Sequence, residues 1–327
     1  MLYPFIFKPI FKDRVWGGRE LERLYAKKIP AAQPIGESWE ISDRPGDAGV
    51  IANGPLAGKN LRWLMEHHAA EILGGAKPAA EGRFPLLCKI LDAREKLSLQ
   101  VHPPANKAAE LKGEPKTEMW FIADAAPDAS LYVGLKNGVT RAEFEEKISD
   151  GSVAECFHRI PVKAGDTMFL PSGRVHAIGD GLVIFEIQQN SDTTYRVFDW
   201  NRVGLDGKPR ELHVAQSLAS IDFSDFEPKL VPAFYRQASG FKFRQLVEDP
   251  LFNVQELAFE NGGALKLAGQ YLRIIAVVKG AAEVGGGDGG KISIQLNPGQ
   301  FCLVPASLKG VEIKARPQTT FLCVEAN

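Results

Sequence analysis

One run of residues decides the fold: Gly165-Asp166-Thr167-Met168-Phe169-Leu170-Pro171-Ser172-Gly173-Arg174-Val175-His176. Gly165 and Asp166 predict a turn into a strand, and Pro171 with Gly173 predicts a second tight turn. His176 then extends from the strand that follows. A histidine placed after two such turns is a specific pattern, and it predicts a metal ligand at the mouth of a β-barrel.

A strand-rich segment earlier in the chain supplies three more possible ligands. Gln100 and His102 are two residues apart, so both side chains leave the same face of a strand. Glu118 follows, and we expect Glu118 and His176 to come from neighbouring strands. Two imidazoles, one carboxylate and one amide oxygen suit zinc or a similar divalent ion. Taken singly, His102 and Glu118 have commoner roles as ordinary polar residues, so the prediction depends on the four occurring together.

The strand and helix patterns predict an all-β fold with a few helices attached. Short strand-like runs broken by Gly, Pro and Asp dominate the chain, as at residues 39–42, 119–123, 167–170 and 182–187. Helices are expected over residues 60–73, 140–148 and 211–217. Asn60 is the expected cap of the first helix, and Thr140 with Glu143 predicts a capping box in the second.

The chain of 327 residues is long enough for two domains. Residues 223–232 carry Phe and Pro among charged residues and predict a connector. We therefore place a boundary near residue 235. A metal-binding catalytic domain is expected over residues 1–235, and a barrel-like domain without metal over residues 236–327.

A weak internal repeat supports two related β domains. The spacing from glycine to proline in residues 165–171 recurs in residues 299–305. Gly310 stands in the second copy where His176 stands in the first. A different motif, residues 285–291, fits the first part of a phosphate-binding loop, but Ile292 follows instead of Ser or Thr. We predict a hairpin tip there and no phosphate site.

Composition limits the classes of partner. The net charge is −1, with 45% apolar and 24% charged residues, so no basic excess attracts nucleic acid or an anionic membrane. No apolar stretch is long enough to cross a bilayer, and the first residues do not form a secretory signal. The four cysteines, Cys88, Cys156, Cys302 and Cys323, are widely spaced and predict buried free thiols in a reducing cytoplasm. The expected partner is a small molecule, and the oligomeric state stays open.

These motifs resemble those of a known family. The run at residues 165–176 looks like the second conserved motif of the cupin barrel. Together with the ligand segments, the block at residues 188–197 and the blocks at residues 9–18 and 36–42, it resembles the type I mannose-6-phosphate isomerases in their short bacterial form. The resemblance implies two cupin-like jelly-roll barrels and one zinc ion per chain. The implied zinc ligands are Gln100, His102, Glu118 and His176.

The resemblance also implies an activity and residues for it. The family interconverts mannose 6-phosphate and fructose 6-phosphate by proton transfer through a cis-enediol. It implies a catalytic role for Arg196, a place in the site for Glu186, and phosphate binding by Ser98 and Lys89. The general base stays open among Glu186, Lys116 and a metal-bound water, since the pKa of Arg196 is too high for a base. Lys116 qualifies only if its pKa is lowered in the site.

Three other functions compete with this one. A cupin isomerase can act on another sugar phosphate, such as glucose 6-phosphate, because the sequence does not reveal the shape of the pocket. The same barrel can serve a non-catalytic sugar-binding or regulatory protein. An iron dioxygenase fits less well, because such sites leave positions open for oxygen and Gln100 fills an extra place here.

Overall fold

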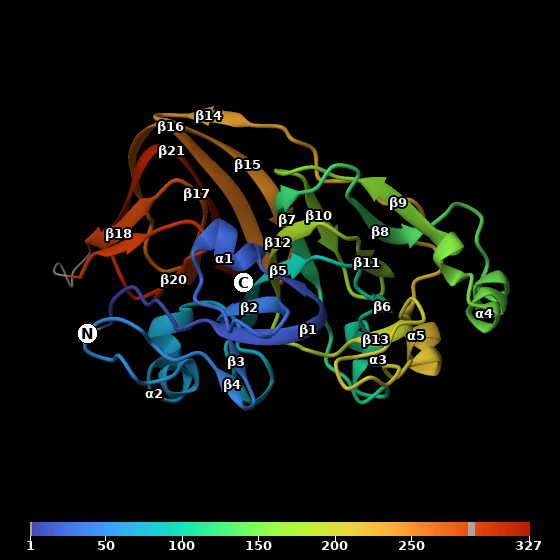
Figure 1. The fold of residues 1–327 in the computed structure, drawn as a ribbon. Helices are drawn as coiled ribbons and strands as arrows, with labels where there is room; N and C mark the ends of the chain where they lie inside the picture. The colour runs from blue at the N-terminus through green and yellow to red at the C-terminus, as the bar shows by residue number, and fades with distance from the viewer. Residues whose placement is uncertain (1, 287–291) are drawn as a thin grey trace.

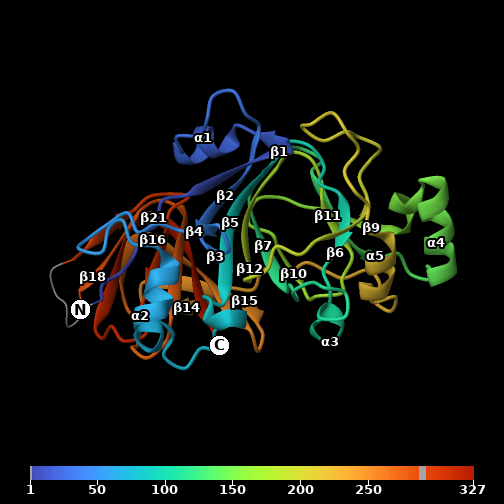
Figure 2. The same ribbon diagram turned by 90° about the horizontal axis from the view of Figure 1, so that it is seen from below.

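The computed structural model describes residues 2–286 and 292–327, and antiparallel strands dominate it (Figure 1). The all-β architecture predicted from the sequence is confirmed. Figures 1 and 2 show the sheet of the last part of the chain, in orange and red, beside the strands of the first barrel. None of the helices among the described residues is long and apolar enough to cross a membrane.

Two sheets form the first barrel. The six-stranded sheet has the order β1 (Ile10–Gly18), β2 (Ile35–Ile41), β5 (Leu86–Ala93), β12 (Leu182–Gln189), β7 (Glu118–Ala125) and β10 (Thr167–Leu170). The five-stranded sheet has the order β13 (Tyr195–Phe198), β6 (Leu99–Val101), β11 (His176–Ile178), β8 (Ser130–Leu135) and β9 (Phe157–Pro161). The short strands β3 (Asp43–Arg44) and β4 (Asp47–Ala48) pair with each other.

The last part of the chain forms a sheet of its own. Its main path runs through β14 (Arg236–Ala238), β15 (Phe241–Glu248), β16 (Phe252–Lys266), β21 (Val311–Ala326), β17 (Arg273–Lys279) and β20 (Phe301–Val304). β18 (Ala282–Gly286) pairs with β21 and with β19 (Ile294–Leu296). The N-terminal segment also reaches this sheet, because Phe5 and Leu303 exchange backbone hydrogen bonds of 2.8 and 2.9 Å. The domain boundary near residue 235 precedes β14 and stays a prediction.

Helices are short and lie outside the sheets (Figure 2). They are α1 (Glu20–Tyr25), α2 (Leu61–Leu73), α3 (Ala105–Ala108), α4 (Arg141–Asp150) and α5 (Val214–Ser220), with 3-10 turns at Ala80–Gly82 and Val153–Cys156. Asn60 caps α2 by accepting from Trp63 N, and Thr140 caps α4 by accepting from Glu143 N. The third expected helix is shifted, since α5 begins at Val214. The residues before it bind Arg196 instead: Glu211 O accepts from Arg196 Nη1, and His213 N donates to Arg196 O.

The repeat seen in the sequence has a structural counterpart. Gly165 and Gly299 both have a positive φ, of 91° and 76°, which glycine adopts without strain. Each is followed by a four-residue strand, β10 or β20, and then by proline. All four cysteines are buried and free, as predicted. The motif at residues 285–291 lies largely outside the described residues, which resume at 292.

β12 explains how the two parts of the molecule share one core. Its apolar residues are buried on both faces, as a strand with layers on both sides requires. Val183, Phe185 and Ile187 pack in the core that includes residues of the last sheet. Leu182 and Ile184 pack in the core of the first barrel. By the period of two, Glu186 shares the barrel-facing side with Ile184, so a polar residue enters an apolar interior.

The packing of Phe185 generates a stability prediction. Its ring stacks on Phe301 of the last sheet at 5.4 Å and meets Tyr25 edge-on at 5.7 Å. We expect Phe185→Ala to lower the free energy of unfolding by about 3–5 kcal/mol in a denaturant titration. The removed ring would leave a cavity that packed side chains surround, so the core could not close it fully. Phe234→Ala is the matched control, since Phe234 is 71% exposed and its loss is expected to cost no more than about 0.5 kcal/mol. Equal effects of the two substitutions would contradict this packing.

Candidate metal centre and active site

Three side chains converge at one end of the first barrel. His102 Nε2 lies 3.5 Å from Glu118 Oε2, and His176 Nε2 lies 3.4 Å from Glu118 Oε1. One ligand atom from each lies within 4.8 Å of the others, and all three residues are buried. Gln100 adjoins them, with its Nε2 3.2 Å from His176 Nε2. The structure therefore brings the four residues singled out in the sequence to one point.

The ligands come from opposite sheets, and this corrects one expectation. Glu118 begins β7 of the six-stranded sheet, whereas His176 begins β11 of the five-stranded sheet. The expectation that Glu118 and His176 occupy neighbouring strands is wrong, because the barrel closes by facing the two sheets toward each other. Gln100 does neighbour His176, directly across the β6–β11 pair, while His102 follows the end of β6.

Backbone carbonyls orient both imidazoles. His102 Nδ1 lies 2.8 Å from Thr193 O, and His176 Nδ1 lies 2.9 Å from Arg174 O. A carbonyl only accepts, so each Nδ1 carries the proton and each Nε2 is left with a lone pair toward Glu118. Burial lowers the pKa of His176 to about 3, and burial followed by the charge of Lys116 lowers the pKa of His102. Neutral imidazoles are the form that binds a metal.

This donor set fits a divalent metal such as zinc. His102 Nε2 and Glu118 Oε1 are buried and accept no hydrogen bond from any described residue. Unpaired buried acceptors are costly, and a cation placed between them would satisfy both. Gln100 would join as a ligand through Oε1, which requires the amide to be rotated by half a turn from the orientation in which Nε2 faces His176.

A cavity of about 560 Å³ opens beside these ligands. Its lining combines apolar surface with charged side chains of both signs. Its walls include the predicted site residues Lys89, Ser98, Gln100, Lys116, Glu186 and Arg196. Its remaining charged wall residues are Asp13, Arg14, Glu37, Asp192, Asp206 and Arg210. A volume of this size is in the range of small-molecule sites.

Lys116 and Glu186 link the metal group to the cavity. Lys116 Nζ lies 2.8 Å from Glu118 Oε2. Burial opposes the charge on Lys116, but Glu118 and Glu186 outweigh it and raise its pKa above the usual range. The low lysine pKa that a basic Lys116 would need is therefore not found. Burial and the charge of Glu118 raise the pKa of Glu186, whose Oε2 accepts from Trp120 Nε1 at 2.9 Å.

Arg196 lies on the same face as two of the ligand residues. It pairs with Gln100 across β13 and β6, and Gln100 pairs in turn with His176 across β6 and β11. Directly opposed residues point to one side of a sheet. Arg196 Nη1 donates to Glu211 O at 2.6 Å, and Arg196 N donates to His213 Nδ1 at 3.2 Å. His213 showed no partner pattern in the sequence, and this backbone contact is local to the strand end.

The two residues expected to bind phosphate have different surroundings. Ser98 is buried and donates to Gln100 Oε1 at 3.3 Å. Lys89 is 3% exposed, so its ammonium group does not face bulk solvent. Its Nζ lies 3.3 Å from Glu186 Oε1 and 3.7 Å from Glu37 Oε2, because β5 lies between β12 and β2.

Glu37 and Arg14 are cavity residues that the sequence did not assign a role. Glu37 Oε1 accepts from Arg14 Nε at 2.7 Å, and Glu37 Oε2 accepts from Trp39 Nε1 at 2.5 Å. Burial opposes ionisation of Glu37, but the charges of Lys89 and Arg14 outweigh it and lower its pKa to about 2. All seven residues of β2 are buried, Glu40 among them, so no sequence signal set Glu37 apart.

Comparison with known proteins agrees with this geometry. Residues 5–127 match the model of the phosphomannose isomerase type I catalytic domain. The mannose-6-phosphate isomerase ManA of Bacillus subtilis is 38% identical over 288 residues, which cover 87% of this chain and 88% of that protein. The mannose-6-phosphate isomerase of Streptococcus mutans is 33% identical and covers 94% of each chain.

The chain belongs to the type I phosphomannose isomerase family. A crystal structure of the mannose 6-phosphate isomerase from Bacillus subtilis superposes with a TM-score of 0.88 at 31% identity, covering 99% of both chains. A phosphomannose isomerase from Salmonella typhimurium, at 17% identity and a TM-score of 0.75, shares the fold. The family resemblance and the enzyme class expected from the sequence, an isomerase, are confirmed. A non-catalytic binding protein is thereby disfavoured.

The convergence of ligands generates a metal-binding prediction. We expect metal-free protein to take up one zinc ion per chain in equilibrium dialysis, and His176→Ala to lose that uptake because one of two imidazoles is gone. His158→Ala is the matched control, since His158 is partly exposed on β9 and away from the ligand group. Full zinc uptake by His176→Ala would count against the site.

The charge pairing of Glu37 generates a pH prediction. Its folded pKa of about 2 lies below the ordinary value of 4.5, so its ionised form stabilises the fold above pH 4.5 by about 3 kcal/mol. That contribution is lost as the pH falls through 4.5 toward 2. We expect Glu37→Gln to be less stable near neutral pH, with the difference from the wild type shrinking in acid, measured by denaturant titration of metal-free protein. The exposed Glu110→Gln is the control, and a Glu37→Gln difference that is constant with pH would refute the pairing.

Proposed function

We propose that the chain is a zinc-dependent aldose–ketose isomerase that interconverts mannose 6-phosphate and fructose 6-phosphate. Family membership supports the reaction class, and both named relatives carry that activity in their names. The observation that carries the proposal is the single cavity wall shared by Gln100, Lys116, Glu186 and Arg196. This wall combines a proposed metal ligand, Gln100, with two cationic side chains and the carboxylate of Glu186. Proton transfer next to a carbonyl uses such a set: a base for the proton and positive charge for the oxygen.

The reaction moves one proton between adjacent carbons of the open-chain sugar. The proton leaves carbon 2 of the aldose, a cis-enediol forms, and a proton returns to carbon 1 while the oxygen on carbon 2 becomes the ketone. A bound zinc ion would supply Lewis acidity toward the sugar oxygens. The proposed zinc ligands are Gln100, His102, Glu118 and His176.

Glu186 is the proposed general base. Its carboxylate lines the cavity, and burial with the nearby charge of Glu118 raises its pKa above the usual value, which makes it a stronger base than an ordinary carboxylate. Lys116 remains protonated beside Glu118, so we assign it to donating hydrogen bonds to a sugar oxygen that gains negative charge.

Arg196 and the phosphate contacts complete the proposal. Arg196 lines the cavity, and its buried Nε finds no acceptor among the described residues, so this donor is available for a substrate oxygen. Ser98 and Lys89 are the proposed phosphate contacts. Lys89 also faces Glu186 and Glu37, so its charge would be divided between these carboxylates and the phosphate.

A coupled assay tests the function directly. Zinc-loaded protein is expected to convert mannose 6-phosphate to fructose 6-phosphate, and chelation of the metal is expected to abolish turnover. Glucose 6-phosphate, measured in parallel, tests the competing isomerase specificity. Turnover of glucose 6-phosphate with none of mannose 6-phosphate would overturn the proposed substrate.

Substitution of Arg196 separates catalysis from metal binding. We expect Arg196→Ala to keep its zinc and lower turnover by about 100- to 1,000-fold, as for loss of one donor to a developing charge. The measurement combines metal analysis with the coupled assay. The exposed Arg236→Ala is the control and is expected to keep wild-type turnover. An Arg196→Ala enzyme with near wild-type turnover would remove Arg196 from the mechanism.

A further inference from the structure

A polar segment at the end of β12 contacts the surroundings of the candidate metal centre on two sides. Residues 190–194 follow β12, and two of them, Asp192 and Thr194, also line the cavity. Gln189 N donates to Thr117 O at 3.0 Å, and Thr117 N donates to Gln189 Oε1 at 2.9 Å, next to Lys116 and Glu118. Four residues later, Thr193 O accepts the hydrogen bond from His102 Nδ1 at 2.8 Å. The conformation of this segment therefore sets the orientation of the His102 imidazole. The segment also contacts Thr117, the residue next to Glu118.

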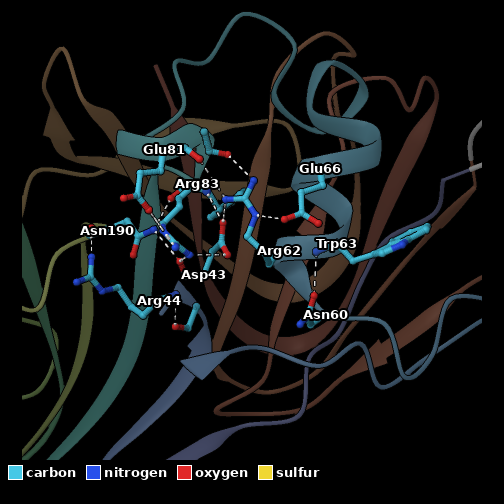
Figure 3. A network of polar contacts seen from close by, with 12 residues as sticks. Asp43, Arg44, Asn60, Arg62, Trp63, Glu66, Glu81, Arg83 and Asn190 are labelled. Carbon is cyan, nitrogen blue, oxygen red and sulfur yellow. Dashed lines mark hydrogen bonds and ion pairs between the residues drawn. The ribbon is translucent and has the colours of Figure 1, made fainter. Parts of the chain in front are cut away.

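Asn190 anchors the segment to the neighbouring part of the molecule (Figure 3). Its side chain is 7% exposed and is not part of the cavity wall. Asn190 Nδ2 donates to Phe84 O at 2.8 Å and to Asp43 O at 3.3 Å, and Asn190 N donates to Pro85 O at 2.9 Å. Asn190 O accepts from Arg44 Nη1 at 2.8 Å. Both donors of one amide group thus hold two backbone carbonyls that are distant in sequence.

The surroundings of this anchor are themselves cross-linked. Asp43 is fully buried, and its Oδ2 accepts from Phe84 N at 2.9 Å and from Arg62 of α2 at 3.3 Å. Arg44 also pairs with Glu114 at 2.7 Å, and Glu114 N donates to Thr193 Oγ1 at 3.0 Å. Figure 3 shows Arg62, Arg83 and Asn190 gathered around Asp43. The anchor is therefore rigid and reaches Thr193 by two routes.

We infer that Asn190 is a positioning residue for the metal centre. Its amide fixes the backbone of residues 189–193, so that Thr193 O holds the His102 ring with Nε2 toward Glu118 and His176. The inference rests on the proposed metal site. It predicts that loss of the Asn190 amide weakens metal binding although Asn190 touches neither metal ligand nor cavity.

Asn190→Asp tests the inference at constant side-chain size. The new carboxylate would place an oxygen where Nδ2 donates, opposite two carbonyl oxygens, and the segment is expected to shift. We expect zinc affinity, measured by competition with a chelator, to fall by about 10- to 100-fold, the usual cost of losing support behind a ligand. The absorption spectrum of the cobalt(II)-loaded variant is expected to differ from that of the wild type, which a general loss of stability would not cause.

Asn60→Asp is the matched control. Asn60 caps α2 by accepting from Trp63 N, and an aspartate keeps that acceptor. Its zinc affinity and cobalt spectrum are expected to equal those of the wild type. Wild-type affinity and spectrum in Asn190→Asp would overturn the inference and leave the proposed function intact. A wild-type chain that binds neither zinc nor cobalt would instead overturn the proposed metal site, and the inference with it.

A second variant keeps the test decisive if Asn190→Asp does not fold. Arg44→Met removes the donor to Asn190 O and the pair with Glu114, while the Arg44 side chain is only partly buried. We expect the same change in the cobalt spectrum and a smaller loss of zinc affinity, because the Asn190 amide contacts remain. An unchanged spectrum and affinity in Arg44→Met would count against the positioning role.

Discussion

The buried carboxylate of Glu118 is the group on which this end of the barrel depends. A carboxylate with no exposed surface is stable in its ionised form only when charges or donors surround it. Lys116, two residues before β7, supplies the charge at 2.8 Å. His176 of β11 and His102, just past the end of β6, face the carboxylate from the opposite side at 3.4 and 3.5 Å. The separation of the two sheets is therefore matched to one carboxylate and two imidazoles.

Side chains of opposite charge alternate along a path that leads from Glu118 into the cavity. Lys116 adjoins Glu118, Glu186 follows, and Lys89 lies between Glu186 and Glu37. Each of these buried charges has a partner of opposite sign, which offsets part of the cost of burying it. The same alternation leaves donors and acceptors along one wall, which suits a small molecule rich in hydroxyl groups.

The rest of the molecule supports this wall from outside. β12 presents Glu186 to the barrel, while Phe185 on its other face stacks on Phe301 of the last sheet. All described residues that line the cavity precede residue 236, so the last sheet supports the site through packing. The Asn190 anchor does the same through hydrogen bonds at the end of β12. Apolar packing thus fixes the middle of β12, and polar cross-links fix the segment that follows its end.

The sequence by itself determined the strand-rich fold and the family, and it singled out the four candidate ligands that the fold brings together, because turn residues and the spacing of polar residues are local signals. It determined α2 and α4 through their caps, Asn60 and Thr140. Only the tertiary structure decided that Glu118 and His176 face each other from opposite sheets, and that Lys116 gains a raised pKa. It also decided the roles of Glu37 and Asn190, whose partners lie on segments distant in the chain. Sheet closure and burial create those contacts, and no local pattern of residues encodes either.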